Sequence, residues 1–208
     1  MCNLYRMRVT TSEIGQIFDA IPDLGANYGE EIYPGYSGLV VADGQAQAMT
    51  WGFPLVLTGK QGQKLKPKPV NNARTDKLQT AFWRDSFARR RCLIPVSEWA
   101  EAEGQKGQMT RTWYSLPGGE SFAVAGVWRA TFEWGNAYSM VMTDGHLQMA
   151  DVHDRMPVIV MRDNWAQWAN GSPDDAFTLC QPWPGDLLVE RSATLWAAAR
   201  PKSITTLI

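Results

Sequence analysis

A cysteine occupies the second position of the chain, directly after the initiator methionine. Removal of Met1 would leave Cys2 with a free α-amine beside its thiol, and these two groups titrate near ~7.7 and ~8.5. Amines condense with aldehydes to Schiff bases, and a thiol on the neighbouring carbon can then close a five-membered thiazolidine. The pair therefore predicts an aldehyde partner, whereas Cys2 considered alone also fits a small residue that enters a strand.

Two other segments carry side chains suited to anion contacts and proton transfer. In "VNNARTDK", Asn72 and Arg74 precede a predicted helix, where amide and guanidinium donors can face a phosphate. In "VHDRMPVIV", His153 and Arg155 alternate onto one face before an apolar strand that Pro157 begins. Each segment alone also fits a structural role, an asparagine cap in the first and a structural histidine in the second.

The segment "EWAEAEG" supplies candidate acid–base residues after an apolar strand that begins at Cys92. Because side chains alternate along a strand, Glu98 and Glu101 lie on opposite faces, and we expect only one of them to face a pocket. A carboxyl group shielded from water has a raised pKa and can act as a general acid or base. The alternative is a solvated strand end.

The segments between these motifs must position them. Short β-rich runs separated by turn residues predict a curved, mostly antiparallel sheet or open barrel with a few peripheral helices. This is an α+β fold, and we expect one domain over residues 1–208. The dipeptide Asp43-Gly44 predicts a hairpin turn. A lysine-rich stretch, residues 59–69, is expected to be a mobile, solvated loop.

Helical spacing predicts three helices. The first is capped by Thr11 or Ser12 and ended by Pro22, the second covers residues 76–90, and the third covers residues 163–170 and ends at Gly171.

Composition narrows the class of protein. Hydrophobic residues make up 45% of the chain and charged residues 20%, with a net charge of −1, so overall charge does not drive nucleic-acid binding. No apolar run approaches the roughly 20 residues that span a bilayer, and the first residues lack the apolar core of a signal peptide. We therefore expect a cytoplasmic protein without membrane contact. Three distant cysteines and two histidines argue against a zinc site or a disulfide scaffold, and no metal or cofactor is expected.

Taken together and in this order, the motifs resemble one known family. Met-Cys at the start, "WGFP" at Trp51, "NNARTD", "RRCLIP" leading to an acidic residue, and "HDRMPVIV" are similar to the SOS response-associated peptidase (SRAP) domains, also described as abasic-site processing proteins. The resemblance implies an enzyme of the SOS response to DNA damage. Its N-terminal cysteine captures the aldehyde of a ring-opened abasic site in single-stranded DNA as a thiazolidine. It also implies autocatalytic removal of Met1, a hydrolase or protease activity, and a lyase activity through the Schiff base.

The resemblance also assigns roles to individual residues. Cys2 matches the nucleophile, Asn72 the asparagine near the reacting amine, and His153 the catalytic histidine. Glu101 lies nine positions after the cysteine of "RRCLIP", where the family has its acid–base glutamate, with Glu98 as the second choice.

Four residues are expected to contact DNA. Arg74 and Arg155 match family arginines near the phosphates. Asn3-Leu4 replaces the usual Gly-Arg after the cysteine, and Arg6 can share the face of position 4 by strand alternation. Trp51 of "WGFP" completes the set.

Two alternatives remain open at this point. One is a cysteine peptidase of the N-terminal-nucleophile type, in which Cys2 attacks peptide bonds of other proteins. The other is a non-catalytic domain that binds single strands through arginines and tryptophans and is indifferent to Cys2. If the chain instead acts as the family resemblance implies, its partner is single-stranded DNA with abasic sites. The protein is expected to be a monomer.

Overall fold

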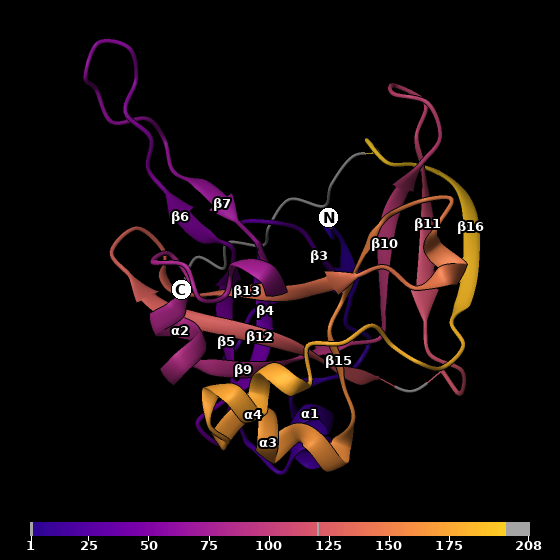
Figure 1. Ribbon diagram of the computed structural model, residues 1–208, viewed down its shortest axis with the longest axis horizontal. Coiled ribbons are helices and arrows are strands. Elements are labelled where there is room, and N and C mark those ends of the chain that lie inside the picture. Colours follow the sequence, from indigo (N-terminus) through magenta and orange to yellow (C-terminus); the bar gives the residue numbers. More distant parts are fainter. Residues whose placement is uncertain (1, 120, 199–208) are drawn as a thin grey trace.

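Antiparallel strand pairs build most of the structure. The computed structural model describes residues 2–119 and 121–198, which form three sheets with short helices around them (Figure 1). The predicted α+β class with a mostly antiparallel sheet is confirmed. The helical elements of this part of the chain are α1 (Thr11–Phe18), α2 (Arg84–Arg89), α3 (Trp165–Asn170) and α4 (Pro173–Thr178), with 3-10 turns η1 (Thr75–Lys77), η2 (Leu147–Met149) and η3 (Arg162–Asn164).

The largest sheet closes on itself. Its five central strands follow the order β13-β12-β9-β4-β5, and β5 pairs back onto β13 in parallel, with Tyr138 opposite Trp51. These strands are β4 (Ser37–Ala42), β5 (Gln45–Trp51), β9 (Arg91–Val96), β12 (Phe122–Thr131) and β13 (Gly135–Asp144). Shorter strands extend the sheet: β2 (Ile21–Pro22), β8 (Asn72–Arg74), β14 (Arg155–Pro157) and β15 (Ile159–Val160).

A second sheet stands beside this barrel and contains the N-terminal strand. Its order is β16-β11-β10-β1-β3. The members are β1 (Tyr5–Arg6), β3 (Glu31–Ile32), β10 (Glu98–Glu103), β11 (Thr110–Ser115) and β16 (Leu188–Leu195). Because β1 lies between β10 and β3, hydrogen bonds hold it on both edges. The third sheet is a separate ribbon of β6 (Phe53–Leu55) and β7 (Lys68–Val70).

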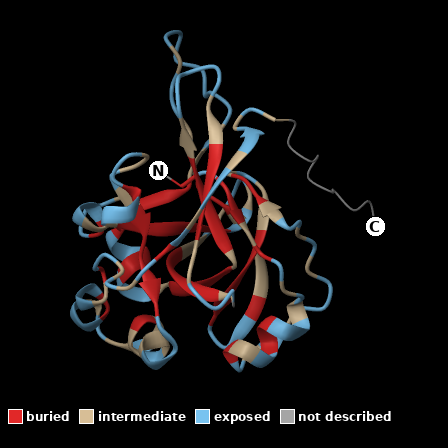
Figure 2. Cartoon of the chain, turned by 90° about the vertical axis from the view of Figure 1, so that its right-hand side faces the viewer, coloured by how far each residue is buried: buried red, intermediate tan, exposed pale blue. Residues whose placement is uncertain are grey.

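One hydrophobic core joins the barrel to the second sheet, and the buried residues concentrate along the strands (Figure 2). At the junction, Tyr5 of β1 packs edge-on against Trp51 with ring centroids 5.0 Å apart, and Trp51 stacks on Tyr138. The hydroxyls of Tyr5 and Tyr138 form a buried hydrogen bond. A Cβ atom at Gly38 of β4 would collide with both hydroxyls, so only glycine leaves room for this pair.

One predicted turn and two predicted helices are present in the structure. Asp43 and Gly44 have φ values of 51° and 73°, as a tight hairpin turn between β4 and β5 requires. The last predicted helix forms as η3 and α3, and Gly171 follows it as its C-cap. The first helix also forms, but its cap is Thr10, whose side chain accepts from the backbone N–H of Glu13 in a capping box.

The predicted helix over residues 76–90 is wrong. The segment forms η1 and then irregular turns, and helix α2 covers only Arg84–Arg89. Leu78, Trp83 and Phe87 are all buried, and their spacing of five and then four residues does not follow one face of a straight helix. The Thr80 hydroxyl also donates to the Lys77 carbonyl at 2.7 Å, which stabilises a turn at this point.

Within the described residues, no helix has the length and apolar character needed to span a membrane.

Candidate functional site

Two adjacent asparagine amides hold the backbone of Cys2. The Cys2 carbonyl accepts one hydrogen bond from Asn71 Nδ2 and one from Asn72 Nδ2, each at 2.8 Å. Asn72 begins β8, which pairs in parallel with β13 opposite Met140. Asn71 also donates to Asn3 Oδ1 at 3.1 Å. Cys2 itself is fully buried. The closed sheet therefore fixes the residue that the sequence singles out as the nucleophile.

Glu101 lies close to this cysteine on β10, in register with Thr112 of β11. Its side chain is buried, and burial raises the pKa of Glu101 to about 7, with a further increase from the charge of Asp154. Burial also raises the pKa of the Cys2 thiol, and the negative charge of Glu101 adds to this effect. Near neutral pH, Glu101 can therefore both give up and accept a proton beside the thiol.

Glu98, the second choice for the acid–base residue, has different partners. Its Oε1 forms ion pairs with Arg6 Nη1 at 2.8 Å and with Arg8 Nη2 at 2.7 Å. Alternation along β10 separates the two glutamates, as predicted: Glu98 is paired with arginines, and Glu101 approaches Cys2. These contacts favour Glu101 as the acid–base residue.

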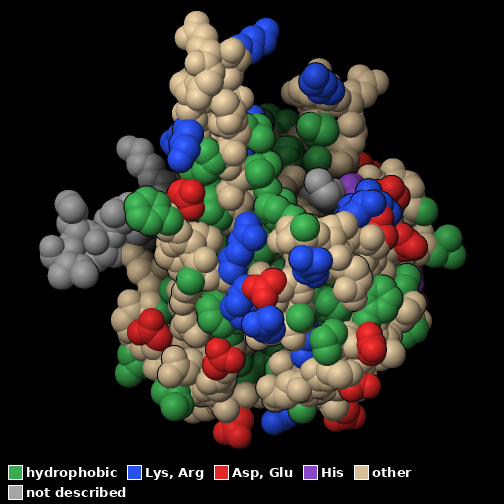
Figure 3. Space-filling view, turned by 60° about the vertical axis from the view of Figure 1, so that its left-hand side comes forward, with side chains coloured by type: hydrophobic (Ala, Val, Ile, Leu, Met, Phe, Trp, Pro, Cys, Tyr) green, Lys and Arg blue, Asp and Glu red, His purple; other side chains and the backbone are tan. Residues whose placement is uncertain are grey.

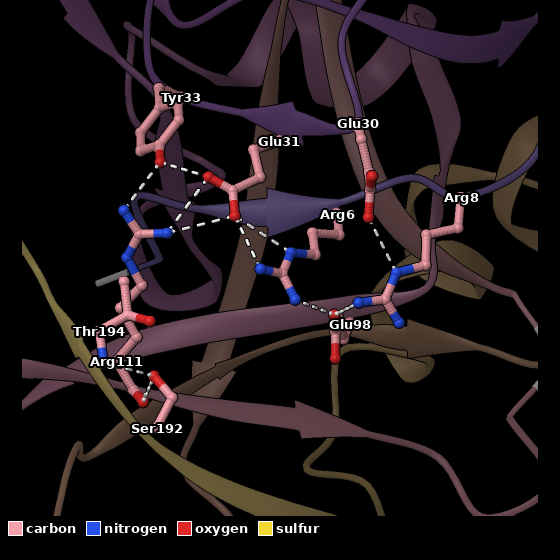
Figure 4. A network of polar contacts seen from close by, with 9 residues as sticks. All are labelled: Arg6, Arg8, Glu30, Glu31, Tyr33, Glu98, Arg111, Ser192 and Thr194. Carbon is pink, nitrogen blue, oxygen red and sulfur yellow. Dashed lines mark hydrogen bonds and ion pairs between the residues drawn. The ribbon is translucent and has the colours of Figure 1, made fainter. Parts of the chain in front are cut away.

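The Arg6–Glu98 pair belongs to a larger network that connects β1, β3, β10 and β11 (Figure 4). Glu31 accepts from Arg6 at 2.8 Å and from Arg111 at 3.2 Å, and Tyr33 donates to Glu31 at 2.6 Å. The Arg6 guanidinium also lies 3.8 Å from the centroid of the Trp113 ring.

This network gives Arg6 partners that the sequence did not predict. All three of its side-chain nitrogens donate to carboxylates of the same chain, Nε and Nη2 to Glu31 and Nη1 to Glu98. These contacts hold β1 against its neighbours, and the contact of Arg6 with DNA stays a prediction. Arg6 does share a face with position 4, since Leu4 packs in the same cluster as Trp113.

The expectation for Trp51 is corrected. The predicted DNA contact needs an exposed ring face, but Trp51 is 0% exposed between Tyr5 and Tyr138. Its Nε1 donates to the Asn71 carbonyl at 3.0 Å. Trp51 therefore positions Asn71 from inside the core, and through Asn71 the carbonyl of Cys2.

His153 and Arg155 lie at the edge of the site. The backbone N–H of Arg155 donates to His153 Nδ1 at 2.9 Å, and Nδ1 also lies 3.2 Å from the Arg155 carbonyl oxygen. Burial lowers the pKa of His153, so the neutral ring is favoured at neutral pH. Both residues line an open pocket of about 500 Å³ with Asp144 and His146. Asp154 acts electrostatically on Glu101, which places this segment near the buried carboxyl.

The arginines expected to contact DNA also have partners within the chain. Arg155 Nη1 lies 3.1 Å from Asp144 Oδ1, and Arg155 begins β14 while Pro157 ends it, so Pro157 does not start the strand. Arg74 is exposed and makes a bidentate contact with Asp76, with both distances 2.9 Å. Arg74 ends a strand and precedes only the 3-residue turn η1, so the predicted helix entrance is absent.

Sequence reasoning missed two features of the site. Only Asn72 was given a role, and Asn71 was not, although both amides hold the same carbonyl; the repeated asparagine was the available signal. The Tyr5–Tyr138 pair had no sequence signal, because 133 positions separate its members.

Cys92 and Cys180 are free and buried like Cys2. Met1, whose removal is predicted, lies outside the described residues.

Comparison with known proteins adds to this geometry. The chain is 30% identical over 149 residues to the abasic site processing protein YoqW of Bacillus subtilis and 27% identical over 148 residues to YoaM of the same organism. Each match covers 66% of this chain, but only 64% of YoqW and 63% of YoaM. The chain thus spans less than two thirds of the length of these relatives.

Solved structures share the fold. A protein from Bordetella bronchiseptica superposes with a TM-score of 0.74 at 21% identity, over 92% of this chain and 99% of that one. A protein from Bacteroides thetaiotaomicron gives a TM-score of 0.73 at 16% identity, over 90% and 91% of the two chains. The family profile described as SOS response associated peptidase (SRAP) matches residues 1–194. The chain therefore belongs to the SRAP family.

Proposed function

We propose that this chain captures abasic sites in single-stranded DNA through Cys2. One observation carries the proposal: the side-chain amides of Asn71 and Asn72 both donate to the Cys2 carbonyl, beside the buried carboxyl of Glu101. The relatives YoqW and YoaM are named abasic site processing proteins. The proposal has two parts: the chain processes abasic sites in damaged DNA, and it does so by forming a covalent bond through Cys2.

The chemistry begins with hydrolysis of the peptide bond between Met1 and Cys2, which consumes one water and frees the α-amine. The amine then adds to the C1′ aldehyde of the ring-opened sugar, and loss of one water gives a Schiff base. The thiol adds to the imine carbon and its proton passes to the nitrogen, which closes the thiazolidine. Aldehyde and aminothiol therefore give the adduct and one water.

Each residue of the site has a proposed task. Glu101 supplies a proton to the sugar ring oxygen as the ring opens, a task suited to a carboxyl whose pKa is about 7. Asn72 orients the amine of Cys2 through the adjoining carbonyl. His153 is proposed to exchange protons with the sugar, and β-elimination from the Schiff base would give a lyase activity. Arg74 and Arg155 are proposed to contact the flanking phosphates.

The peptidase alternative has less support. Cysteine peptidases attack with a thiolate whose pKa is depressed, whereas burial and Glu101 raise the pKa of the Cys2 thiol. In the aldehyde reaction the amine attacks first, so a preformed thiolate is not needed.

Intact-mass measurement tests the proposal. Purified protein should first lack the mass of one methionine residue. After incubation with an abasic single strand it should gain the mass of the oligonucleotide minus one water. Cys2→Ala should give no adduct, while Cys180→Ala, a matched change at another buried cysteine, should react like the wild type. A protein with a free Cys2 amine that gives no adduct would refute the proposal.

A further inference from the structure

The β6–β7 ribbon continues well beyond its two named strands. Leu65 N–H donates to the Leu57 carbonyl at 2.8 Å, Thr58 bridges Lys64, and Gly59 N–H donates to the Gln63 carbonyl at 2.7 Å. Residues 53–70 therefore form one hairpin, here called the arm, which projects from the body of the molecule (Figure 1). The prediction of a loop over residues 59–69 overlooked this pairing.

The arm has an unusual charge. It carries Lys60, Lys64, Lys66 and Lys68, and the sequence has no acidic residue between Asp43 and Asp76. The whole chain has a net charge of −1, so this segment differs sharply in sign from the average. Within the described residues, none of these four lysines forms an ion pair, unlike the neighbouring Lys77 and Arg74, which share Asp76.

One face of the arm is also apolar. Leu55 is paired with Lys68, and Leu57 lies opposite Leu65, two residues further along the first strand and three along the second, so the register shifts by one residue. Alternation places Leu55 and Leu57 on the same face, with their partners beside them. The three leucines are 37%, 44% and 40% exposed. Lys68, the partner of Leu55, shares this face, whereas Lys64 and Lys66 flank Leu65 and alternate onto the opposite face. The arm thus carries apolar side chains on one face and positive charge on both.

The root of the arm is fixed to the candidate site. Strand β7 ends at Val70 and leads directly to Asn71 and Asn72, whose amides hold Cys2. At the other strand, Gly52 has a φ of 117° and donates from its N–H to the Tyr138 carbonyl at 2.7 Å. A Cβ at Gly52 would collide with Pro69. The arm therefore leaves the barrel at a set angle.

A second projection stands across from the arm. The β10–β11 hairpin, which carries Glu101 in the middle of β10, rises on the other side, and Figure 3 shows the surface hollowed between the two projections, with basic side chains on both.

We propose that the arm binds the DNA backbone next to the reacting sugar, with its lysines on phosphates and its leucines against sugars and bases. This identification of the partner rests on the proposed function. Phosphates of a flanking single strand and of a flanking duplex share the required chemistry. Counterion release makes such contacts strongly dependent on salt.

The test uses the full chain and a strand that carries tetrahydrofuran in place of the abasic sugar, which has no aldehyde and reports binding alone. In Lys64→Gln/Lys66→Gln, the slope of log affinity against log salt should become shallower by about 1.4, since each contact to a single strand contributes about 0.7. The control is Arg89→Gln/Arg162→Gln, which removes the same charge from α2 and η3 and should leave the slope unchanged. All four residues are at the surface, so the variants should fold.

Oligonucleotide design locates the phosphates. A strand extended on one side of the tetrahydrofuran should lose affinity in the arm variant, whereas one too short to reach the arm should not. A complementary strand that makes the extension a duplex identifies the source: an effect that appears only then assigns the contact to duplex phosphates.

Two outcomes separate the proposals. An arm variant whose salt slope equals that of the wild type overturns the arm proposal, even where Cys2 forms its adduct normally. A wild type that forms no adduct, but whose salt-dependent binding is weakened by the lysine changes, overturns the proposed function and supports the arm as a nucleic-acid surface.

Discussion

The two faces of strand β10 contain the same residue type in two different settings. Glu98 meets Arg6 and Arg8, and Glu101, three positions later, is buried near Cys2 with its pKa raised to about 7. The first carboxylate is neutralised by guanidinium groups and joins a network across four strands. The second lies beside a thiol whose pKa it raises further.

Burial alone does not decide the role of a carboxyl group. Glu98 and Glu101 are 7% and 2% exposed, so both are removed from water. Paired positive charge makes a buried carboxylate structural, whereas weaker compensation leaves a proton that can move near neutral pH. The arginine face holds β1 in place, and the Cys2 face uses that fixed position.

The largest expected effect is on the rate of adduct formation, where the two glutamates should differ most. Glu101→Gln should slow adduct formation with an abasic single strand by about 100-fold or more, as expected for loss of a general acid. Glu98→Gln is the matched control and should react within a few-fold of the wild type. Quenched time courses with excess DNA measure both rates. Equal slowing in the two variants would contradict the division of roles.

The next effect appears in stability against pH. The pKa of Glu101 is about 7 in the folded state and 4.5 ordinarily, so the wild type loses stability as pH rises between these values. Glutamine has no charge to bury. The advantage of Glu101→Gln over the wild type should therefore grow across this window, to about 3 kcal/mol at most, and stay constant above it. Urea unfolding at several pH values measures it, and a difference independent of pH would argue against a raised pKa.

A smaller effect is expected on the arginine face. Glu98→Gln removes one carboxylate and leaves Arg6 and Arg8 without this partner, which should cost about 2 kcal/mol of unfolding free energy, between surface and fully buried pairs. Urea unfolding at neutral pH checks this value. No loss of stability would mean that the network of Figure 4 does not hold β1.

The smallest expected change is a loss of unfolding free energy in a variant of Arg6. Arg6→Lys keeps the charge but loses the planar group that contacts Glu31, Glu98 and the Trp113 ring together. We expect a loss of about 1 kcal/mol in unfolding free energy and unchanged affinity for an unreactive single strand. A large fall in DNA affinity with unchanged stability would instead support the prediction that Arg6 contacts DNA.

Sequence patterns predicted the features that depend on neighbouring residues. The Asp43-Gly44 turn and the helix that ends at Gly171 follow from local backbone preferences. The closure of the barrel did not follow, because the pairing of β5 with β13 joins segments nearly ninety positions apart in the sequence. Helix α4 was missed although Ser172 and Asp175 form a capping box at its start.

For the site, sequence patterns named candidate residues but did not reveal their partners within the chain. Nothing local to "MCNLYR" shows that Arg6 is paired with Glu31 and Glu98, which come from two other strands. Likewise, "WGFP" does not reveal that Trp51 is enclosed by Tyr5 and Tyr138. Such assignments need the long-range contacts that only the folded chain provides.

The double-sided pairing of β1 has a mechanical consequence. Beyond its register with β10 and β3, Leu4 accepts from Ala100 N–H at 2.9 Å, and Arg6 accepts from Ser97 N–H at 2.8 Å. Tension on a strand attached at Cys2 would load these bonds together, in shear, on an inner strand of a five-stranded sheet, between β10 and the edge strand β3. A pull on the DNA would therefore be resisted by the whole sheet, and detachment would require reversal of the bond at Cys2 before β1 could be drawn out.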